Sequence, residues 1–233
     1  MRKIIYVFLS AALFFIAAAI ITVTVMGYQM FARALENKSL DEAVSEIREQ
    51  ESFTALGELP DTYTDAIIAA EDHRFFSHNG IDPISIARAA WHNLISGSLA
   101  EGGSTITQQL AKNMFFTQEK SFIRKAAEAF MAIRIESEYS KEEILELYVN
   151  TIYFGDGYYC VKDACAGYFG KLPKDMNDYE CTMLAGIPNA PSAYAPTENI
   201  GLARERQRQV VECMVRFGFI SEDEGEEIAE GAI

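Results

Sequence analysis

The stretch Ile4–Met26 reads IIYVFLSAALFFIAAAIITVTVM and contains no charged residue. A helix of this length rises about 35 Å, enough to cross a hydrocarbon core of roughly 30 Å. Arg2 and Lys3 precede it and no dense basic run follows, so the positive-inside rule places the N-terminus in the cytoplasm. A cleaved signal peptide is the alternative, but the apolar run is too long and no small-x-small site follows it. The sequence therefore predicts a cytoplasmic segment, residues 1–3, and one uncleaved transmembrane helix, residues 4–26.

The rest of the chain is patterned mostly for helices. Capping and stop signals predict five helices. The first is opened by Asp82 and Pro83 and stopped at Gly97, and the second is capped by Ser104 and runs through Lys112. The third is capped by Thr117 and covers residues 118–137, the fourth is opened by the capping box of Ser140 and Glu143, and the last covers residues 202–217. Convincing β alternation, internal repeats and a long linker rich in Pro, Gly or Ser are not found in the sequence.

These signals predict a mainly α protein with a simple domain order. Residues 27–58 are polar and mildly amphipathic, and we expect them to form a helical stalk or the first helix of the domain. Residues 59–221 are expected to form one helical domain, large enough to bury a core. Residues 222–233 contain six acids and are expected to form an acidic C-terminal tail.

The charge of the chain restricts its ligands. The formal net charge is −14, which makes the chain a poor general binder of nucleic acid, so no nucleic-acid partner is expected. An anionic substrate would have to be held by a local basic cluster. Residues 102–127 provide one, because four bases stand there against the single acid Glu119. The bases are Lys112, Lys120, Arg124 and Lys125.

The cysteines carry less information. Cys160, Cys165, Cys181 and Cys213 lack the paired short spacings of a zinc site or a redox pair. In an extracytoplasmic domain a disulfide between Cys160 and Cys181, or between Cys165 and Cys181, is chemically allowed. We expect instead free thiols that are buried and pack as small hydrophobic side chains.

The first segment with chemical potential is Glu71–Gly80, EDHRFFSHNG. It follows the apolar run Ala66–Ala70, so Glu71 stands at the end of a buried helix. Partial desolvation there would raise the pKa of its carboxyl and make it a better base near neutral pH. A surface carboxylate that forms local ion pairs with Arg74 is the alternative that this segment alone favours.

The second segment leads with two glycines, Gly102 and Gly103, into the helix capped by Ser104. Free backbone N–H groups at a positive helix end suit a phosphate, although the spacing is not that of a P-loop. The same helix is followed by the apolar triplet 114–116, which we expect to pack in the core or, in a membrane-tethered domain, to dip into the bilayer.

The third segment is the helix expected over residues 118–137. One face is expected to be core and consists of Phe122, Ala126, Phe130 and Ile133. Arg124 and Glu128 are four residues apart and project from the opposite side, with Lys125 nearby, which by itself indicates an ordinary solvated ion pair. Met131 and Ile135 share that side, so a lined groove is the alternative.

Read together, the segments resemble the peptidoglycan glycosyltransferases, the lysozyme-like transglycosylases. The resemblance covers about residues 59–219. Its motifs are E-D-x-x-F-x-x-H-x-G at 71–80, G-G-S-T-I-T-Q-Q-L-A-K-N at 102–113, R-K-x-x-E at 124–128, E-I-L-E-L-Y-V-N-x-I-Y-F-G at 143–155 and L-A-G-I-P-x-x-P-x-x-Y-x-P at 184–196. Five long motifs in order are a specific signal, and they imply a lysozyme-like, two-lobed helical domain behind the transmembrane helix.

The resemblance also implies a reaction and its residues. Glu71 matches the base that takes the proton from the 4-hydroxyl of the acceptor sugar, whose oxygen attacks C1 of the donor and inverts it. Glu128 matches the second acid, which assists the pyrophosphate leaving group directly or as a ligand of a divalent cation, Mg²⁺ or Mn²⁺. Positions that match those lining the phosphate and donor-sugar sites are Ser104, Gln109, Lys112, Lys120, Arg124 and Lys125.

The partners that the resemblance implies are lipid II, the growing lipid-linked glycan strand, the membrane and other cell-wall synthesis proteins. The expected location is the cell membrane, with a single pass and an extracytoplasmic catalytic domain. The chain ends at Ile233 with no S-x-x-K transpeptidase signature, so a monofunctional enzyme is expected. A muramidase would also use a catalytic Glu but would have no pyrophosphate to hold, and an inactive scaffold would be expected to lack Glu71 or Glu128.

Overall fold

The computed structural model describes residues 2–96, 102–117, 119 and 121–231. Within these residues the fold is helical and has no β-strand, which confirms the mainly α class. The α-helices are α1 (Arg2–Asn37), α2 (Leu40–Arg48), α3 (Asp61–Glu71), α4 (Pro83–Ser96), α5 (Ile106–Phe115), α6 (Phe122–Glu136), α7 (Lys141–Val149), α8 (Val161–Phe169), α9 (Asp178–Gly186), α10 (Pro191–Tyr194), α11 (Pro196–Arg216) and α12 (Glu222–Ala229). Short 3-10 helices lie at Leu56–Glu58, Phe75–Ser77, Pro173–Asp175 and Ile187–Asn189.

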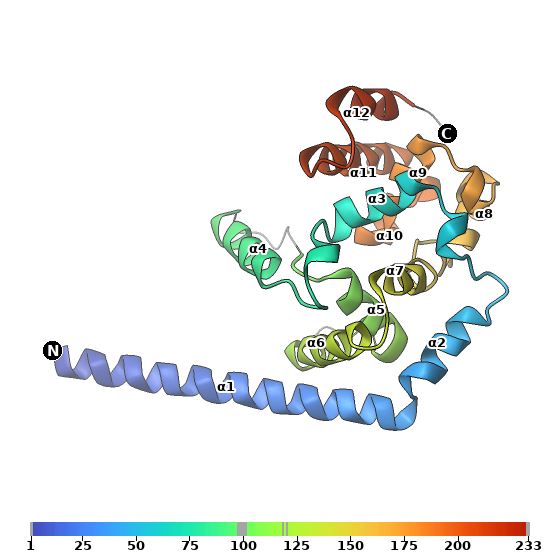
Figure 1. Ribbon diagram of the computed structural model, residues 1–233. Helices are drawn as coiled ribbons and strands as arrows, with labels where there is room; N and C mark the ends of the chain where they lie inside the picture. Colours follow the sequence, from blue (N-terminus) through green and yellow to red (C-terminus); the bar gives the residue numbers. More distant parts are fainter. Residues whose placement is uncertain (1, 97–101, 118, 120, 232–233) are drawn as a thin grey trace.

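The helices of the domain form two lobes (Figure 1). In one lobe α3, α9, α11 and α12 pack against one another; in the other α5 packs against α6 and α7, with α1 alongside α6. A single core joins the lobes, because Ile67 of α3, Leu110 of α5 and Tyr148 of α7 belong to the same cluster and are all fully buried. The two-lobed helical domain is therefore confirmed, and the ends of α3 and α5 meet between the lobes.

Helix α1 is much longer than the stretch that predicted it. Leu9–Asn37 is long and apolar enough to cross a membrane, with none of its most apolar part buried in the protein, and this fits a membrane-anchored protein. The residues expected as a stalk continue this helix without a break as far as Asn37. The chain then turns at Ser39, whose capping box with Glu42 opens α2.

The second half of α1 packs on α6. Gly27 allows the closest approach, since a Cβ at this position would lie only 2.5 Å from the Cβ of Ala126. Next to it the ring of Tyr28 meets the ring of Phe130 edge to face, with the centroids 5.5 Å apart, and Phe31 contacts the same ring. Small and aromatic side chains thus join the anchor directly to the domain.

We expect Gly27→Ala to lower the thermal midpoint of the detergent-solubilised protein. The added methyl group overpacks the contact with Ala126, at a cost of about 1–3 kcal/mol. Adding Ala126→Gly in the same chain should recover part of the loss, whereas Gly57→Ala should change little, because a Cβ on Gly57 would meet nothing within 4 Å. Equal midpoints for Gly27→Ala and Gly57→Ala would contradict the close α1–α6 contact.

The buried face of α6 is not the predicted one. Phe122 is 85% exposed and Ile133 is 51% exposed, so the prediction of a core face there was wrong. The buried residues are Ala127, Glu128, Met131, Ala132 and Ile135. The reason is α1, which packs on Ala126 and Phe130 and leaves the other face of α6 to fill the core.

Several expected helix boundaries also differ. Thr105, not Ser104, caps α5, and Ser121, not Thr117, caps α6; residue 118, where that helix was expected to begin, lies outside the described residues, as does the expected stop at Gly97. Helix α11, which was expected to begin at about residue 202, begins at Pro196 and is kinked at Asn199. The capping box of Ser140 and Glu143 and the cap by Asp82 are confirmed.

The acidic C-terminal segment is not an extended tail. Ser221 and Glu224 form a capping box that opens α12, and Gly225 of this helix is buried where a Cβ would lie 2.7 Å from a methyl group of Val215 on α11. The cysteines are free thiols as expected, and three of them are buried: Cys160, Cys165 and Cys181.

Candidate active site

Glu71 is the last residue of α3 and lies where the two lobes meet. Its Oε2 accepts a hydrogen bond of 2.8 Å from Nε2 of Gln109 on α5. Its Oε1 is shielded from solvent and has no hydrogen-bond partner among the described residues. Burial raises the pKa of the Glu71 carboxyl above its ordinary value, while the Gln109 hydrogen bond and the charges of Arg206 and Lys112 oppose the rise and that of Asp72 adds to it. A carboxylate in this state is a suitable general base.

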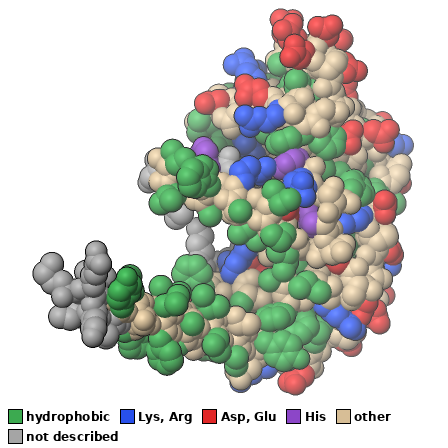
Figure 2. All heavy atoms as spheres, turned by 60° about the vertical axis from the view of Figure 1, so that its left-hand side comes forward, with side chains coloured by type: hydrophobic (Ala, Val, Ile, Leu, Met, Phe, Trp, Pro, Cys, Tyr) green, Lys and Arg blue, Asp and Glu red, His purple; other side chains and the backbone are tan. Residues whose placement is uncertain are grey.

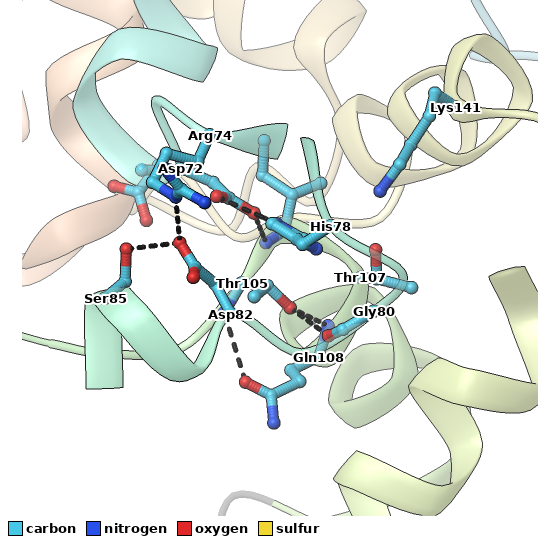
Figure 3. A network of polar contacts seen from close by, with 12 residues as sticks. Asp72, Arg74, His78, Gly80, Asp82, Ser85, Thr105, Thr107, Gln108 and Lys141 are labelled. Atoms are coloured by element: carbon cyan, nitrogen blue, oxygen red, sulfur yellow. Dashed lines mark hydrogen bonds and ion pairs between the residues drawn. The ribbon is translucent and has the colours of Figure 1, made fainter. Parts of the chain in front are cut away.

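The next residue, Asp72, fixes the end of α3 to the start of α5 (Figure 3). Its carboxylate accepts hydrogen bonds from Nε2 of His78, at 2.9 Å, and from the backbone N–H of Ile106, at 3.1 Å. An acid facing the N-terminal turn of a helix is also favourably placed toward the helix dipole. Within the motif at 71–80, Asp72 and His78 therefore fix the backbone next to the candidate base, Glu71.

A second contact in Figure 3 fixes the loop that leads into α4. Asp82 pairs with Nε of Arg74 at 3.0 Å and accepts hydrogen bonds from the Ser85 hydroxyl and the Ile84 amide. Burial alone would raise the pKa of Asp82, but these hydrogen bonds and the Arg74 charge lower it to about 2. Arg74 therefore pairs with Asp82, and not with Glu71 as the alternative from the sequence had it.

Glu128 lies at the centre of a cationic cluster on α6, and its side chain is 1% exposed. Its Oε2 accepts a hydrogen bond of 2.8 Å from Nζ of Lys125, and that same Nζ donates to the hydroxyl of Ser104. Its Oε1 lies 2.9 Å from Nε of Arg124, a charge contact without hydrogen-bond alignment, because neither atom has a hydrogen-bond partner among the described residues. The ion pair that the sequence alone indicates as solvated is therefore buried on the side of the acid.

Lys112 is within electrostatic reach of both carboxylates, Glu71 and Glu128. Burial lowers the pKa of its ammonium group. The charges of Glu128 and Glu71 oppose this lowering, whereas those of Arg124 and Lys125 add to it. We therefore count Lys112 in the cationic cluster with Arg124 and Lys125, and three cations against the one buried acid Glu128 leave an excess of positive charge that suits an anion.

Arg206 of α11 is the site residue that the sequence analysis missed. Its charge acts on Glu71, its Nε donates to the backbone oxygen of Gly186 at 3.3 Å, and its guanidinium lies 5.9 Å from the centre of the Tyr194 ring. Its position near Glu71 depends on the packing of α11 against α3, which no local pattern indicates.

Of the predicted substrate-binding residues, the structure brings most together. Lys112, Arg124, Lys125 and Ser104 belong to the cationic cluster, whereas Gln109 contacts Glu71 instead. Lys120 lies outside the described residues. The predicted roles of these side chains toward a phosphate or a sugar stay predictions.

A groove beside the cationic cluster separates α1 from the α5–α6 connection. It has a volume of about 490 Å³, and its lining is partly apolar, with Met26, Met30, Phe115 and Phe116, and partly polar, with Gln29, Arg33, Glu119 and Arg124. The apolar triplet 114–116 is half-buried, so it is neither wholly in the core nor fully exposed, and two of its members, Phe115 and Phe116, line the groove. Figure 2 shows hydrophobic side chains gathered along α1 and on the helix above it, α4.

The residues do not by themselves form a metal site. No group of three or more His, Cys, Asp or Glu side chains within the described residues is placed to hold a metal ion. Glu128 would have to contribute its Oε1 alone, next to two cations that already balance its charge. This donor set does not fit a cation held by the protein alone.

A two-lobed helical domain with a shielded carboxylate beside a cationic cluster is an arrangement that suits chemistry on an anionic substrate. The sequence profile of the Transglycosylase family matches residues 37–215. Penicillin-binding protein 1F of Bacillus subtilis is 43% identical over 184 residues, which cover 79% of this chain and 26% of that protein. A Cupriavidus necator protein named as a transglycosylase is 44% identical over 186 residues, 80% of each chain. The chain belongs to the Transglycosylase family.

The chain spans only part of some relatives, about a quarter of the length of penicillin-binding protein 1F. Among solved structures, the penicillin-binding protein 1A of Haemophilus influenzae superposes with a TM-score of 0.47 at 23% identity, over 78% of this chain and 17% of that one.

Proposed function

We propose that the chain is a peptidoglycan glycosyltransferase that polymerises lipid II into β-1,4-linked glycan strands. The observation that carries the proposal is the pairing of a buried carboxylate that has a free oxygen, Glu71, with the cationic cluster around Glu128. A base and an anion site are the two parts that transfer of a sugar from a pyrophosphate donor requires. Membership of the Transglycosylase family supports the same activity.

In the proposed reaction, Glu71 accepts the proton of the acceptor 4-hydroxyl through its unpartnered Oε1. The acceptor oxygen forms a bond to C1 of the donor sugar while the bond from C1 to the pyrophosphate oxygen breaks. The electron pair leaves with undecaprenyl pyrophosphate, so the α-linked donor gives a β-linked product by inversion. Lys112, Arg124 and Lys125 stabilise the charge that develops on the leaving group, and Glu128 orients Arg124 and Lys125.

The groove supports a lipid-linked substrate. Arg124 lines it and also belongs to the cationic cluster, and one of its walls is α1, the helix that fits a membrane anchor. We propose that the helix spans the membrane once with the N-terminus in the cytoplasm, as Arg2 and Lys3 indicate, and that the domain faces outward. Other cell-wall synthesis proteins are proposed partners.

A divalent cation, Mg²⁺ or Mn²⁺, stays a proposal. If one takes part, Glu128 is the acid of the site that would contribute a ligand, and it would supply further positive charge for the pyrophosphate. Isothermal titration of the protein with Mg²⁺ in the absence of lipid should show no tight binding, because the protein donors alone do not form a site.

Incubation of the purified protein with lipid II, and separately with finished glycan strands, tests the proposed function. Lengthening of lipid II into polymer supports it. Cleavage of finished glycan, with no polymer formed from lipid II, would identify a muramidase instead and overturn the proposal.

We expect Lys125→Ala to raise the KM for the lipid-linked donor about tenfold or more, because a cation that hydrogen-bonds a buried carboxylate is lost from the proposed anion site. Lys171→Ala is a matched control, since Lys171 also binds a buried acid, Glu180, and is 39% exposed against 41% for Lys125. Both variants should lose a similar amount of thermal stability, but the control should keep its KM. An unchanged KM in Lys125→Ala would contradict the anion site.

A further inference from the structure

Three polar side chains from three helices form one hydrogen-bonded chain behind the candidate base. The hydroxyl of Tyr148 on α7 donates to Oε1 of Gln109 on α5 at 3.2 Å. Nε2 of that amide donates to Oε2 of Glu71 on α3 at 2.8 Å. Tyr148 is fully buried, so its hydroxyl reaches no solvent, and Gln109 is the acceptor that the structure gives it.

The direction of this chain follows from the chemistry of its members. An ionised carboxylate only accepts hydrogen bonds, so the amide nitrogen of Gln109 must face Glu71 and the amide oxygen must face Tyr148. Burial, and after it the negative charge of Glu71, raises the pKa of Tyr148 well above its ordinary value, so the hydroxyl keeps its proton and donates it. If the amide turned by 180°, its oxygen would face the oxygen of Glu71, which is favourable only when Glu71 is protonated.

We propose that Tyr148 is a positioning residue for the reaction: its hydroxyl fixes the orientation of the Gln109 amide, so that the amide nitrogen holds Glu71 in the ionised, proton-accepting form. The proposal rests on the proposed function, in which Glu71 is the base. In this proposal Gln109 acts at the base and not at the donor sugar, and the buried hydroxyl of Tyr148 has a function.

The charged groups that act on Glu71 are Asp72, which follows it in the chain, Lys112 on α5 and Arg206 on α11. All three remain in Tyr148→Phe, which removes one buried oxygen and leaves the ring in place. A change in the titration of Glu71 in this variant can therefore be assigned to the hydroxyl and the amide that it orients.

In Tyr148→Phe we expect kcat for lipid II polymerisation to fall several-fold with little change in KM. The acid limb of the pH–rate profile should move upward by about 0.5–1 pH unit, the size of one neutral hydrogen bond. The sign follows because a misoriented amide no longer favours the ionised carboxylate, so a higher pH is needed to deprotonate Glu71.

Tyr168→Phe is the matched control. The hydroxyl of Tyr168 donates to the backbone oxygen of Phe154 at 2.8 Å, so its removal also costs one internal hydrogen bond. Both variants should lose thermal stability, but only Tyr148→Phe should move the acid limb. The double variant of Tyr148→Phe and Gln109→Met should shift it no further than Gln109→Met alone, because Tyr148 acts through Gln109; additive shifts would overturn the proposal.

If Tyr148→Phe does not fold, a second substitution that should move the acid limb in the opposite direction tests the proposal. Replacing Tyr148 by 3-fluorotyrosine retains the ring and makes the hydroxyl a stronger donor, so the acid limb should move to lower pH. The pKa of Glu71 can also be followed without turnover by ¹³C NMR of glutamate-labelled protein, with the signal assigned by Glu71→Gln.

The NMR titration separates the two proposals. If the wild-type protein does not polymerise lipid II, the proposed function fails, while the NMR comparison of wild type and Tyr148→Phe still measures the effect on Glu71. If the wild-type protein is active and its Glu71 titrates at the same pH in Tyr148→Phe, the positioning role is wrong and the proposed function stands.

Discussion

Glu71→Gln should abolish polymerisation of lipid II and at the same time make the domain more stable at neutral pH. Loss of a general base costs about 10²–10⁴-fold in rate. The amide has nearly the same shape as the carboxyl, and its oxygen can still accept the hydrogen bond from Gln109. Binding of lipid II, measured by titration of the inactive variant, should therefore change little.

The gain in stability follows from the direction of the pKa shift. Burial raises the pKa of Glu71 in the folded state above the value of about 4.3 for an unfolded glutamate. The folded state therefore binds this proton more tightly than the unfolded state does, and that contribution to stability is present in acid and is lost as the pH rises through the folded pKa. A glutamine never carries the charge, so the variant should have the higher thermal midpoint at neutral pH, and the difference should vanish in acid.

Asp65→Asn is the control for this result. Burial, and then the charge of Asp61, raises the pKa of Asp65 as well, but Asp65 is not part of the site. This variant should keep its turnover at neutral pH. Full turnover in Glu71→Gln would show that another group is the base.

Glu128→Gln should lower both the stability of the domain and its turnover. Its loss leaves Arg124, which is 13% exposed, without a counter-charge, and breaking a buried pair costs about 3–5 kcal/mol. We expect a loss at or below the lower end of this range, because Lys125 is 41% exposed and can turn to water. Turnover should fall about 100-fold or more, since Arg124 and Lys125 are no longer oriented toward the leaving group.

Glu180→Gln separates these two effects. Glu180 is also 1% exposed and pairs with a lysine, Lys171, outside the candidate site. Both variants should have a lower thermal midpoint, but Glu180→Gln should keep its kcat at temperatures where it is folded. If both variants lost kcat in parallel, Glu128 would have a structural role alone.

The grouping of the candidate site residues was predicted from the sequence better than the packing that holds them together was. The carboxylate at the end of an apolar helix and the basic window are local features, and Glu71, Lys112, Arg124 and Lys125 do lie together. Thr105 could not be told from Ser104 as the cap of α5, because the choice depends on distant partners: Thr105 also donates to the oxygen of Gly80, and Ser104 accepts from Lys125.

The errors have a common physical cause. The face of α6 was assigned from its own periodicity, but which face is buried depends on Gly27 and Tyr28 of α1, which belong to the stretch expected to form a stalk or the first helix of the domain. Arg206 and Tyr148 reach the neighbourhood of Glu71 only through packing between helices far apart in sequence. Periodicity reports that a helix has a buried side, whereas tertiary contacts decide what covers it.

Because the second half of α1 packs directly on α6, most closely at Gly27 and Ala126, the anchor is also a helix of the domain. An enzyme on a flexible tether could sample a volume above the bilayer, whereas in the proposed function this packing keeps the catalytic centre close to the surface. Encounters with a lipid-linked substrate then take place in two dimensions, and the rate should follow the mole fraction of that lipid in the bilayer and not its amount per volume of solution. Diluting the vesicles should leave turnover per enzyme unchanged, whereas diluting the substrate with inert lipid should lower it.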